Sequence, residues 1–112
     1  MKKLTKKIVA FRDARNWKQF HNPKDMVLSL VLEAAEVAEH FQWKNAKEMQ
    51  EYIKEHRNDI GEELADAFYW VLLISNDLNI DLEQAFNKKM KQNKKKYPVS
   101  KAKGRHDKYT KL

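Results

Sequence analysis

Residues 32–43 read LEAAEVAEHFQW, and they extend the apolar run MVLSLVL at 26–32. With Glu33 at zero on a helical wheel, Glu36 and His40 both fall within about 60° of it. Apolar side chains occupy most of the remaining circumference. A helix with one face in water carries a much wider polar arc. The stretch therefore predicts a helix that is buried almost all round and carries one narrow acidic stripe.

A second stretch, DIGEELADAFYWVLLISND at 59–77, repeats this pattern. With Glu63 at zero, Asp66 also falls within about 60°, and the flanking positions are apolar. The chain thus contains Glu33-x-x-Glu36 and Glu63-x-x-Asp66 on two apolar segments. Carboxylates three residues apart share one helical face. If the two acidic faces meet, all of these carboxylates converge.

Converging carboxylates need either protons or a cation, because repulsion and poor solvation disfavour the ionised forms. An all-oxygen ligand set suits Mg²⁺, with Mn²⁺ as the alternative. A di-iron bundle would need Glu-x-x-His on two helices, and no histidine of this chain has a glutamate three residues before it. The sequence therefore predicts a Mg²⁺ site at the two acidic pairs. The alternative is a pair of acidic stripes on separate solvated surfaces.

The composition favours an all-α fold in a single domain. The chain has 112 residues, no cysteine, two glycines and two prolines, which leaves little turn chemistry for hairpins. Good N-cap residues, Asn22, Asn45 and Asp81, precede three of the helical patterns. We expect helices at about 4–17, 23–42, 46–56, 59–78 and 82–97, with a break or kink near Arg57. The expected architecture is a four- to five-helix bundle.

The sequence shows neither a membrane span nor a secretory signal, and its basic residues gather at the C-terminal end. No apolar run reaches the roughly 20 residues of a membrane span, and no apolar segment follows the basic N-terminus as in a secretory signal. We therefore expect a cytoplasmic protein without a membrane partner. Residues 88–112 contain 11 Lys and Arg against one Asp, although the whole chain has a net charge of only +7. This basic end is a solvated tail, a nucleic-acid contact or an attractor for a polyanionic substrate.

Several motifs together resemble one enzyme family, over residues 10 to 98. They are the two acidic pairs, RNWKQFHNP at 15–23, FQW at 41–43, EELAD at 62–66 and KMKQNKKKYP at 89–98. The pattern is similar to the MazG-like all-α nucleoside triphosphate pyrophosphohydrolases, and most of all to their dCTP pyrophosphatase branch. The closing KYTKL at 108–112 also resembles that branch. One departure is Ala35, where many relatives have glycine, and it concerns local helix packing.

The resemblance implies a domain at 1–98, a basic tail at 99–112 and a reaction, NTP + H₂O → NMP + PPi. It implies Mg²⁺ bound by Glu33, Glu36, Glu63 and Asp66. Glu36 is the expected proton acceptor for the attacking water, with Glu33 as the alternative. The expected substrate is dCTP or a base-modified dCTP, and the expected role is cleansing of the nucleotide pool.

The resemblance also implies two groups of substrate-binding residues. Expected phosphate contacts are Lys89, Asn93, Lys96 and Tyr97, although Lys96 also fits a solvated run of lysines. Expected base contacts are Trp17, His21, Trp43 and Tyr69. Flat aromatic faces can stack on a pyrimidine. The alternative is that Trp17 and Trp43 belong to the core.

Other functions and the assembly state stay open at this point. A basic helical module that binds nucleic acid is the alternative outside enzymology, but two acidic motifs would repel nucleic acid. Within the enzymes, a dUTP or phosphoribosyl-ATP pyrophosphohydrolase is the alternative. The apolar circumference of the two acidic helices exceeds what a chain of this length can cover. We therefore expect a homotetramer, with a dimer as the fallback, to complete the bundle.

Overall fold

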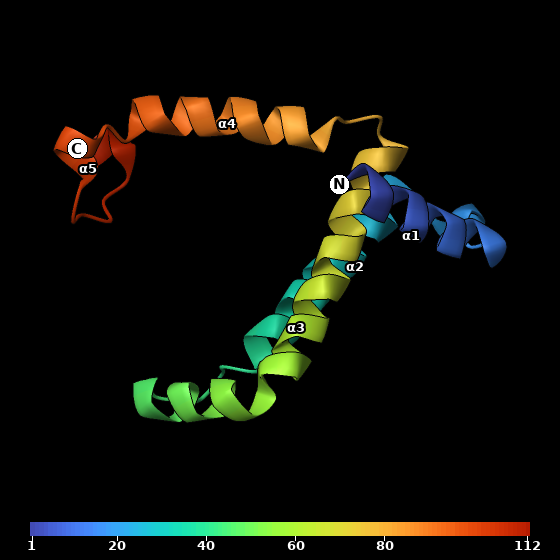
Figure 1. The fold of residues 1–112 in the computed structure, drawn as a ribbon, viewed down its shortest axis with the longest axis horizontal. Helices are drawn as coiled ribbons and strands as arrows, with labels where there is room; N and C mark the ends of the chain where they lie inside the picture. The colour runs from blue at the N-terminus through green and yellow to red at the C-terminus, as the bar shows by residue number, and fades with distance from the viewer. The chain divides into compact units, whose positions relative to one another are not determined.

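The computed structural model describes residues 1–112 and confirms the all-α fold class. Its helices are α1 (Lys2–Ala14), α2 (Pro23–Glu39), α3 (Ala46–Asp77), α4 (Leu82–Lys96) and α5 (Val99–Ala102), with short 3₁₀ turns at Lys18–Phe20 and Tyr109–Lys111 (Figure 1). No helix has both the length and the apolar character needed to cross a membrane.

The chain divides into two compact units, residues 1–79 and residues 80–112. The first contains α1, α2 and α3, and the second contains α4 and α5. The predicted boundary between a domain at 1–98 and a tail at 99–112 stays a prediction.

The expected helix starts after Asn22 and Asn45 are confirmed by their capping bonds. The side chain of Asn22 accepts a hydrogen bond from the backbone N–H of Asp25, and Pro23 occupies the first helical position of α2. At the start of α3, Asn45 and Glu48 bond reciprocally to each other's backbone N–H groups. These bonds satisfy N–H groups that have no partner within the helix. Each start is therefore fixed locally.

The helix ends differ more from the sequence pattern. Helix α2 ends at Glu39, three residues before the expected end, and passes into a turn that closes at Trp43 with a φ of 69°. Helix α3 runs on through the expected break near Arg57 but is kinked, because His56 has non-helical angles of φ −117° and ψ 22°. The kink separates a short N-terminal arm from the long C-terminal part of α3.

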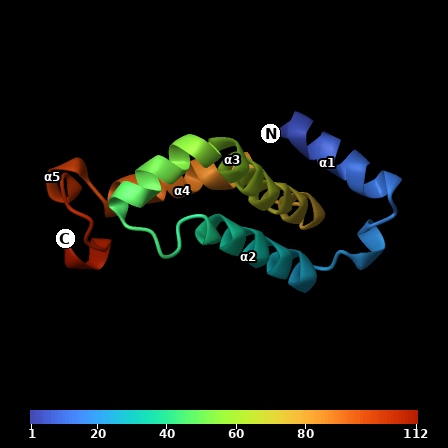
Figure 2. The same cartoon turned by 90° about the horizontal axis from the view of Figure 1, so that it is seen from below.

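Within the first unit, α2 lies side by side with the C-terminal part of α3 and runs in the opposite direction (Figures 1 and 2). Helix α1 packs on α3 as well. The fully buried apolar side chains are Met26, Leu72 and Leu73, at most 3% exposed. This small core lies between α2 and α3 near the end of α3.

The apolar circumference of α2 is not covered within one chain. Val27, Leu28, Val31 and Leu32 are 46% to 65% exposed. The sequence predicted a helix buried almost all round, so the single chain buries α2 much less than expected. The reason is geometric, because only α3 contacts α2 extensively.

Candidate functional site

The two acidic pairs face each other across the contact between α2 and α3. Glu33 and Glu36 come from α2, and Glu63 and Asp66 come from α3. One oxygen of each carboxylate can be chosen so that all of them lie within 4.8 Å of one another. The three-residue spacing places each pair on one helical face, and the antiparallel packing brings the faces together. We refer to these residues as the carboxylate cluster.

Electrostatics in the carboxylate cluster are unfavourable for four free anions. Oε2 of Glu33 and Oε2 of Glu63 are buried and have no hydrogen-bond partner. Burial, together with repulsion from Glu36 and Asp66, raises the pKa of Glu33. A hydrogen bond with Glu36, burial and repulsion from the neighbouring carboxylates raise the pKa of Glu63 to about 7. Glu63 is therefore partly protonated near neutral pH unless a cation is bound.

The donor set fits a hard divalent cation. All its atoms are carboxylate oxygens, which is the chemistry that Mg²⁺ and Mn²⁺ prefer. The two buried oxygens without a hydrogen-bond partner are those that a bound cation would satisfy. Glu33, Glu36, Glu63 and Asp66 could therefore hold one.

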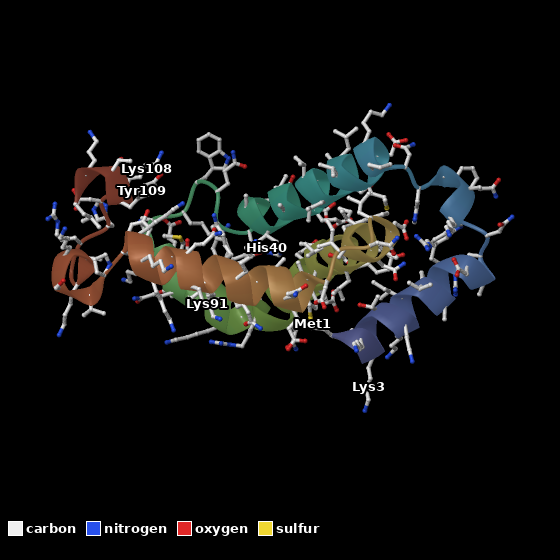
Figure 3. All side chains as sticks on the ribbon, turned by 90° about the horizontal axis from the view of Figure 1, so that it is seen from above. Met1, Lys3, His40, Lys91, Lys108 and Tyr109 are labelled. Carbon is white, nitrogen blue, oxygen red and sulfur yellow. The ribbon has the colours of Figure 1, made fainter.

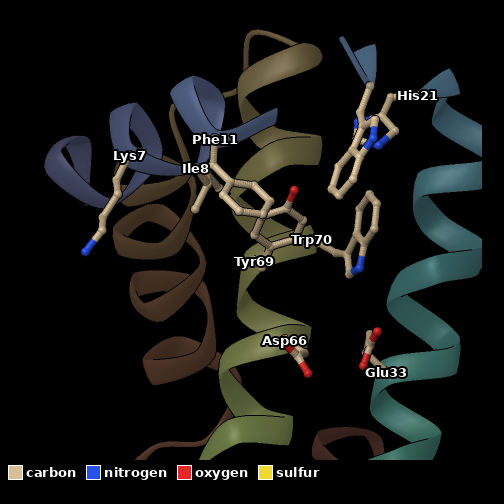
Figure 4. Close-up of a pocket in the computed structure, with 9 residues that line it drawn as sticks. Lys7, Ile8, Phe11, His21, Glu33, Asp66, Tyr69 and Trp70 are labelled. Atoms are coloured by element: carbon tan, nitrogen blue, oxygen red, sulfur yellow. The ribbon is translucent and has the colours of Figure 1, made fainter. Parts of the chain in front are cut away.

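A cavity of about 470 Å³ adjoins the carboxylate cluster. Glu33 and Asp66 belong both to the cluster and to the wall of this cavity, and they face each other from α2 and α3 (Figure 4). The other lining residues come from α1, the segment that follows it, and α3: Lys7, Ile8, Phe11, Trp17, His21, Tyr69 and Trp70. We call this cavity the aromatic pocket. A ligand in the aromatic pocket would therefore lie next to the carboxylate cluster.

The aromatic side chains of the pocket support one another edge to face. The ring centroids of Phe11 and Trp17 are 5.7 Å apart, and those of Tyr69 and Trp70 are 5.2 Å apart. His21 approaches Trp70 in the same manner at 5.2 Å. Such pairs are a preferred packing of aromatic rings, so the walls of the pocket are formed before a ligand binds.

Two polar groups of the aromatic pocket have shifted pKa values. Burial, with a contribution from Arg12, lowers the pKa of His21, and Nδ1 of its ring is buried without a hydrogen-bond partner. Burial also raises the pKa of Tyr69, against the effect of the nearby arginines. Both groups are therefore uncharged near neutral pH. An uncharged His21 thus lies in the same wall as the aromatic rings.

A buried ion pair fixes α1, and with it one wall of the pocket. Nη1 of Arg12 donates to Oδ2 of Asp77 at 2.6 Å, and Arg12 is only 1% exposed. Burial opposes ionisation of Asp77, but the hydrogen bond and charge of Arg12, with a hydrogen bond from Asn76, hold the pKa of this carboxyl below its usual value. Phe11, which is next to Arg12, contacts Tyr69 edge to face, with 6.4 Å between the ring centroids. The ion pair thus positions the pocket wall.

The family model that matches the chain is MazG-like, and it covers residues 28–112. The chain belongs to the MazG-like family. Mouse dCTP pyrophosphatase 1 is 38% identical over 104 residues, which are 91% of this chain and 61% of that protein. The human dCTP pyrophosphatase 1 is 36% identical over 104 residues. This MazG-like chain therefore spans about three fifths of the length of these curated relatives.

A solved structure supports the same assignment. The crystal structure of a pyrophosphatase from Archaeoglobus fulgidus superposes with a TM-score of 0.83 at 33% sequence identity. The match covers 88% of this chain and 92% of the archaeal chain. The family resemblance read from the sequence motifs is thereby confirmed.

The expected base-binding residues separate into two groups in this MazG-like chain. Trp17, His21 and Tyr69 line the aromatic pocket. Trp43 does not line it, because the turn after α2 leaves this side chain 90% exposed. The sequence analysis missed Trp70 and Phe11. Trp70 follows Asp66 by four residues and so shares its helical face, which was the available signal.

The expected phosphate contacts all lie in the second unit, at α4. Lys89 is exposed, Asn93 and Lys96 are half-buried, and Tyr97 is 37% exposed. Within this unit, Nζ of Lys96 lies 4.7 Å above the ring of Tyr109. Their role in binding phosphate stays a prediction.

Proposed function

We propose that this MazG-like chain is a nucleoside triphosphate pyrophosphohydrolase that depends on a divalent metal ion. It would convert a nucleoside triphosphate and water to the monophosphate and pyrophosphate. The observation that carries the proposal is the carboxylate cluster opening directly into the aromatic pocket. The relatives named dCTP pyrophosphatase 1 support the same reaction class.

The metal ion and the carboxylates have separate roles in the proposed reaction. Glu33, Glu36, Glu63 and Asp66 would hold Mg²⁺, with Mn²⁺ as the alternative. The ion would supply positive charge to neutralise the triphosphate and polarise its α-phosphoryl group. Glu36 accepts the proton of the attacking water, with Glu33 as the alternative acceptor. The carboxylates alone would repel a triphosphate, so the cation is required for binding as well as for turnover.

The aromatic pocket is the proposed base site. Trp17, Tyr69 and Trp70 line it with aromatic rings that can stack on a base, and the imidazole of His21 lines it beside them. We propose dCTP or a base-modified dCTP as the substrate, by analogy with the named relatives. The proposed role is cleansing of the cytoplasmic nucleotide pool.

The proposal also covers residues that bind the phosphates and the assembly of the chain. Lys89, Asn93, Lys96 and Tyr97 on α4 are proposed to bind the triphosphate. The exposed apolar face of α2 supports a homotetramer, with a dimer as the fallback. The exposed Trp43 stays a proposed base contact. Nucleic acid is not proposed as a partner, since the carboxylate cluster would repel it.

A nucleotide panel tests the proposed reaction. The purified chain is incubated with each common dNTP and NTP and with 5-methyl-dCTP, with MgCl₂ and with excess EDTA. The expected products are the monophosphate and pyrophosphate in equal amounts, fastest for a cytosine deoxynucleotide and absent with EDTA. A diphosphate with orthophosphate, or full activity in EDTA, would contradict the proposal. Light scattering at micromolar protein tests the assembly, and an active monomer of 13.4 kDa would contradict it.

A further inference from the structure

His40, labelled in Figure 3, contacts Glu63 of the carboxylate cluster and is not itself a member of the cluster. It follows the last residue of α2, and its side chain is only 14% exposed. Nε2 of its ring is 3.9 Å from Oε1 of Glu63, and Nδ1 is 2.6 Å from the hydroxyl oxygen of Tyr52. One imidazole therefore connects a tyrosine hydroxyl to a carboxylate of the cluster.

Both contacts of His40 come from α3, on opposite sides of its kink. Tyr52 belongs to the N-terminal arm, Glu63 belongs to the long C-terminal part, and His56 at the kink stands between them. The ring of His56 stacks on Tyr52 at 4.2 Å. Nδ1 of His56 is 3.2 Å from Oδ2 of Asp59. The kink and its polar contacts thus allow one helix to reach both nitrogens of the same ring.

Tyr52 is also held from outside α3. Nζ of Lys44, in the turn between α2 and α3, lies 4.3 Å from the centroid of the Tyr52 ring. The contacts of the Tyr52 ring with Lys44 and His56 restrict its rotation, and its hydroxyl therefore stays directed at His40. A side chain with this many contacts fixes the orientation of the group that it touches.

The contacts select one arrangement of protons on His40. A neutral imidazole has one N–H donor and one acceptor nitrogen. When Glu63 is ionised, as it would be with a cation bound, its oxygens only accept, so the proton of His40 then belongs on Nε2. Nδ1 then accepts from the Tyr52 hydroxyl, which can donate. Oε1 of Glu63 is thereby directed at His40, and Oε2, which is buried without a hydrogen-bond partner, is left for the cation.

We propose that Tyr52 and His40 form a positioning relay that orients Glu63 for binding a divalent cation. The relay acts through Glu63 and does not touch the substrate. At 3.9 Å the contact between His40 and Glu63 is longer than a direct hydrogen bond, so its effect is electrostatic orientation. This inference rests on the proposed function, because it assumes that the carboxylate cluster binds a metal ion. Partners that orient a ligand in this way typically contribute about 10- to 100-fold to metal affinity.

Mn²⁺ binding to the nucleotide-free protein tests the relay without using activity. The EPR signal of free Mn²⁺ gives the dissociation constant for wild type and for the variants His40→Leu, His40→Gln and Tyr52→Phe. We expect His40→Leu to weaken binding by about tenfold or more. His40→Gln keeps an N–H donor near the position of Nε2 and should stay within about threefold of wild type. The dissociation constant of Tyr52→Phe should lie between those of His40→Gln and His40→Leu.

The control variants are matched in chemistry and lie in the exposed second unit. His106→Leu and Tyr109→Phe make the same changes at residues 106 and 109, and they should bind Mn²⁺ as wild type does. The double variant His40→Leu with Tyr52→Phe should bind no more weakly than His40→Leu alone, because the hydroxyl acts only through the imidazole. Circular dichroism at 222 nm compares the helix content of each variant with that of wild type.

The outcomes separate this inference from the proposed function. If wild type binds no Mn²⁺ and has no activity, the proposed function fails, and the relay fails with it. If wild type binds Mn²⁺ but His40→Leu binds it equally well with intact helix content, only the relay is overturned. Equal weakening by His40→Gln and His40→Leu would also overturn it, since that result indicates a packing role for the ring.

Discussion

Charged side chains meet at two places along α3, and their charges are balanced differently at each. Near the end of the helix, Asp77 receives a hydrogen bond from the buried Arg12, and the two charges compensate each other. Near residues 63–66, acidic side chains meet other acidic side chains from α2, with two buried oxygens left unpartnered. The first arrangement is complete within the chain, whereas the second is not.

Charge compensation distinguishes a structural ion pair from a candidate binding site. A compensated pair lowers the pKa of its acid, as Arg12 does for Asp77, and it holds two helices together. An uncompensated cluster raises the pKa of its acids, as for Glu63, and this destabilises the ionised protein. Carboxylates with raised pKa values of this kind are typical of sites that bind a cation or a substrate.

The largest expected effect is on activity at the uncompensated cluster. Glu36→Gln or Glu63→Gln should lower kcat/KM by roughly a thousandfold, as expected when a main source of transition-state stabilisation is removed. The unfolding midpoint should not fall, because repulsion decreases. Pyrophosphate release and thermal unfolding provide the measurements. The control is the neighbouring exposed Glu62→Gln, and a similar loss there would show that the contrast does not depend on the cluster.

At the compensated pair, the largest effect is expected on stability. Arg12→Met leaves Asp77 without its cation and should cost about 3 kcal/mol, near the lower end for a broken buried pair because Asp77 keeps some solvent contact. Urea unfolding measures the difference. Adding Asp77→Leu to Arg12→Met should recover much of the loss. The exposed Arg57→Met is the control, and an equal loss there would remove the special role of Arg12.

Metal addition should make the cluster resemble the compensated pair. Mg²⁺ at a hundred times its dissociation constant should stabilise the folded chain by about 2.7 kcal/mol, provided that it binds only the native state. Chemical denaturation with MgCl₂ or with EDTA measures this difference. The Glu36→Gln variant should lose most of it. An equal gain in wild type and Glu36→Gln would place the metal elsewhere.

A smaller effect, on the pH dependence of stability, has opposite signs in the two regions. The pKa of Glu63 rises from 4.5 to about 7 on folding, so in EDTA its contribution is fully present below pH 4.5 and is lost as the pH rises towards 7. The pKa of Asp77 is lowered from 3.8, so its contribution is present above that value and is lost as the pH falls. Thermal unfolding between pH 3 and pH 8 measures both. Glu63→Gln should flatten the pH dependence of stability only above pH 4.5. A change confined to the acidic range of Asp77 would contradict the assignment.

The carboxylate cluster could be predicted from sequence because its rules are local. Spacing of three residues fixes which carboxylates share a helical face, and the helix starts at Asn22 and Asn45 follow from capping chemistry. The antiparallel contact of two adjacent helices then suffices to bring Glu33 and Asp66 together.

The rest depends on packing that no local pattern encodes. Arg12 and Asp77 are 65 residues apart in sequence, and a buried arginine in a basic first helix reads as one more surface charge. The pocket roles of Phe11 and Trp70 depend on how α1 packs on α3. The contact of His40 with Tyr52 depends on the kink in α3, whose position could be expected but whose direction could not.

The register of α3 has a consequence for how members of this family can diverge. Asp66 and Asp77 are separated by eleven residues, which is about three turns and roughly 16 Å, so they lie within about 20° of the same face. Inserting or deleting one residue between them would rotate one site by about 100° relative to the other. Homologous chains should therefore change length in the turns before Pro23 and Ala46, while the segment between residues 66 and 77 keeps its length through evolution.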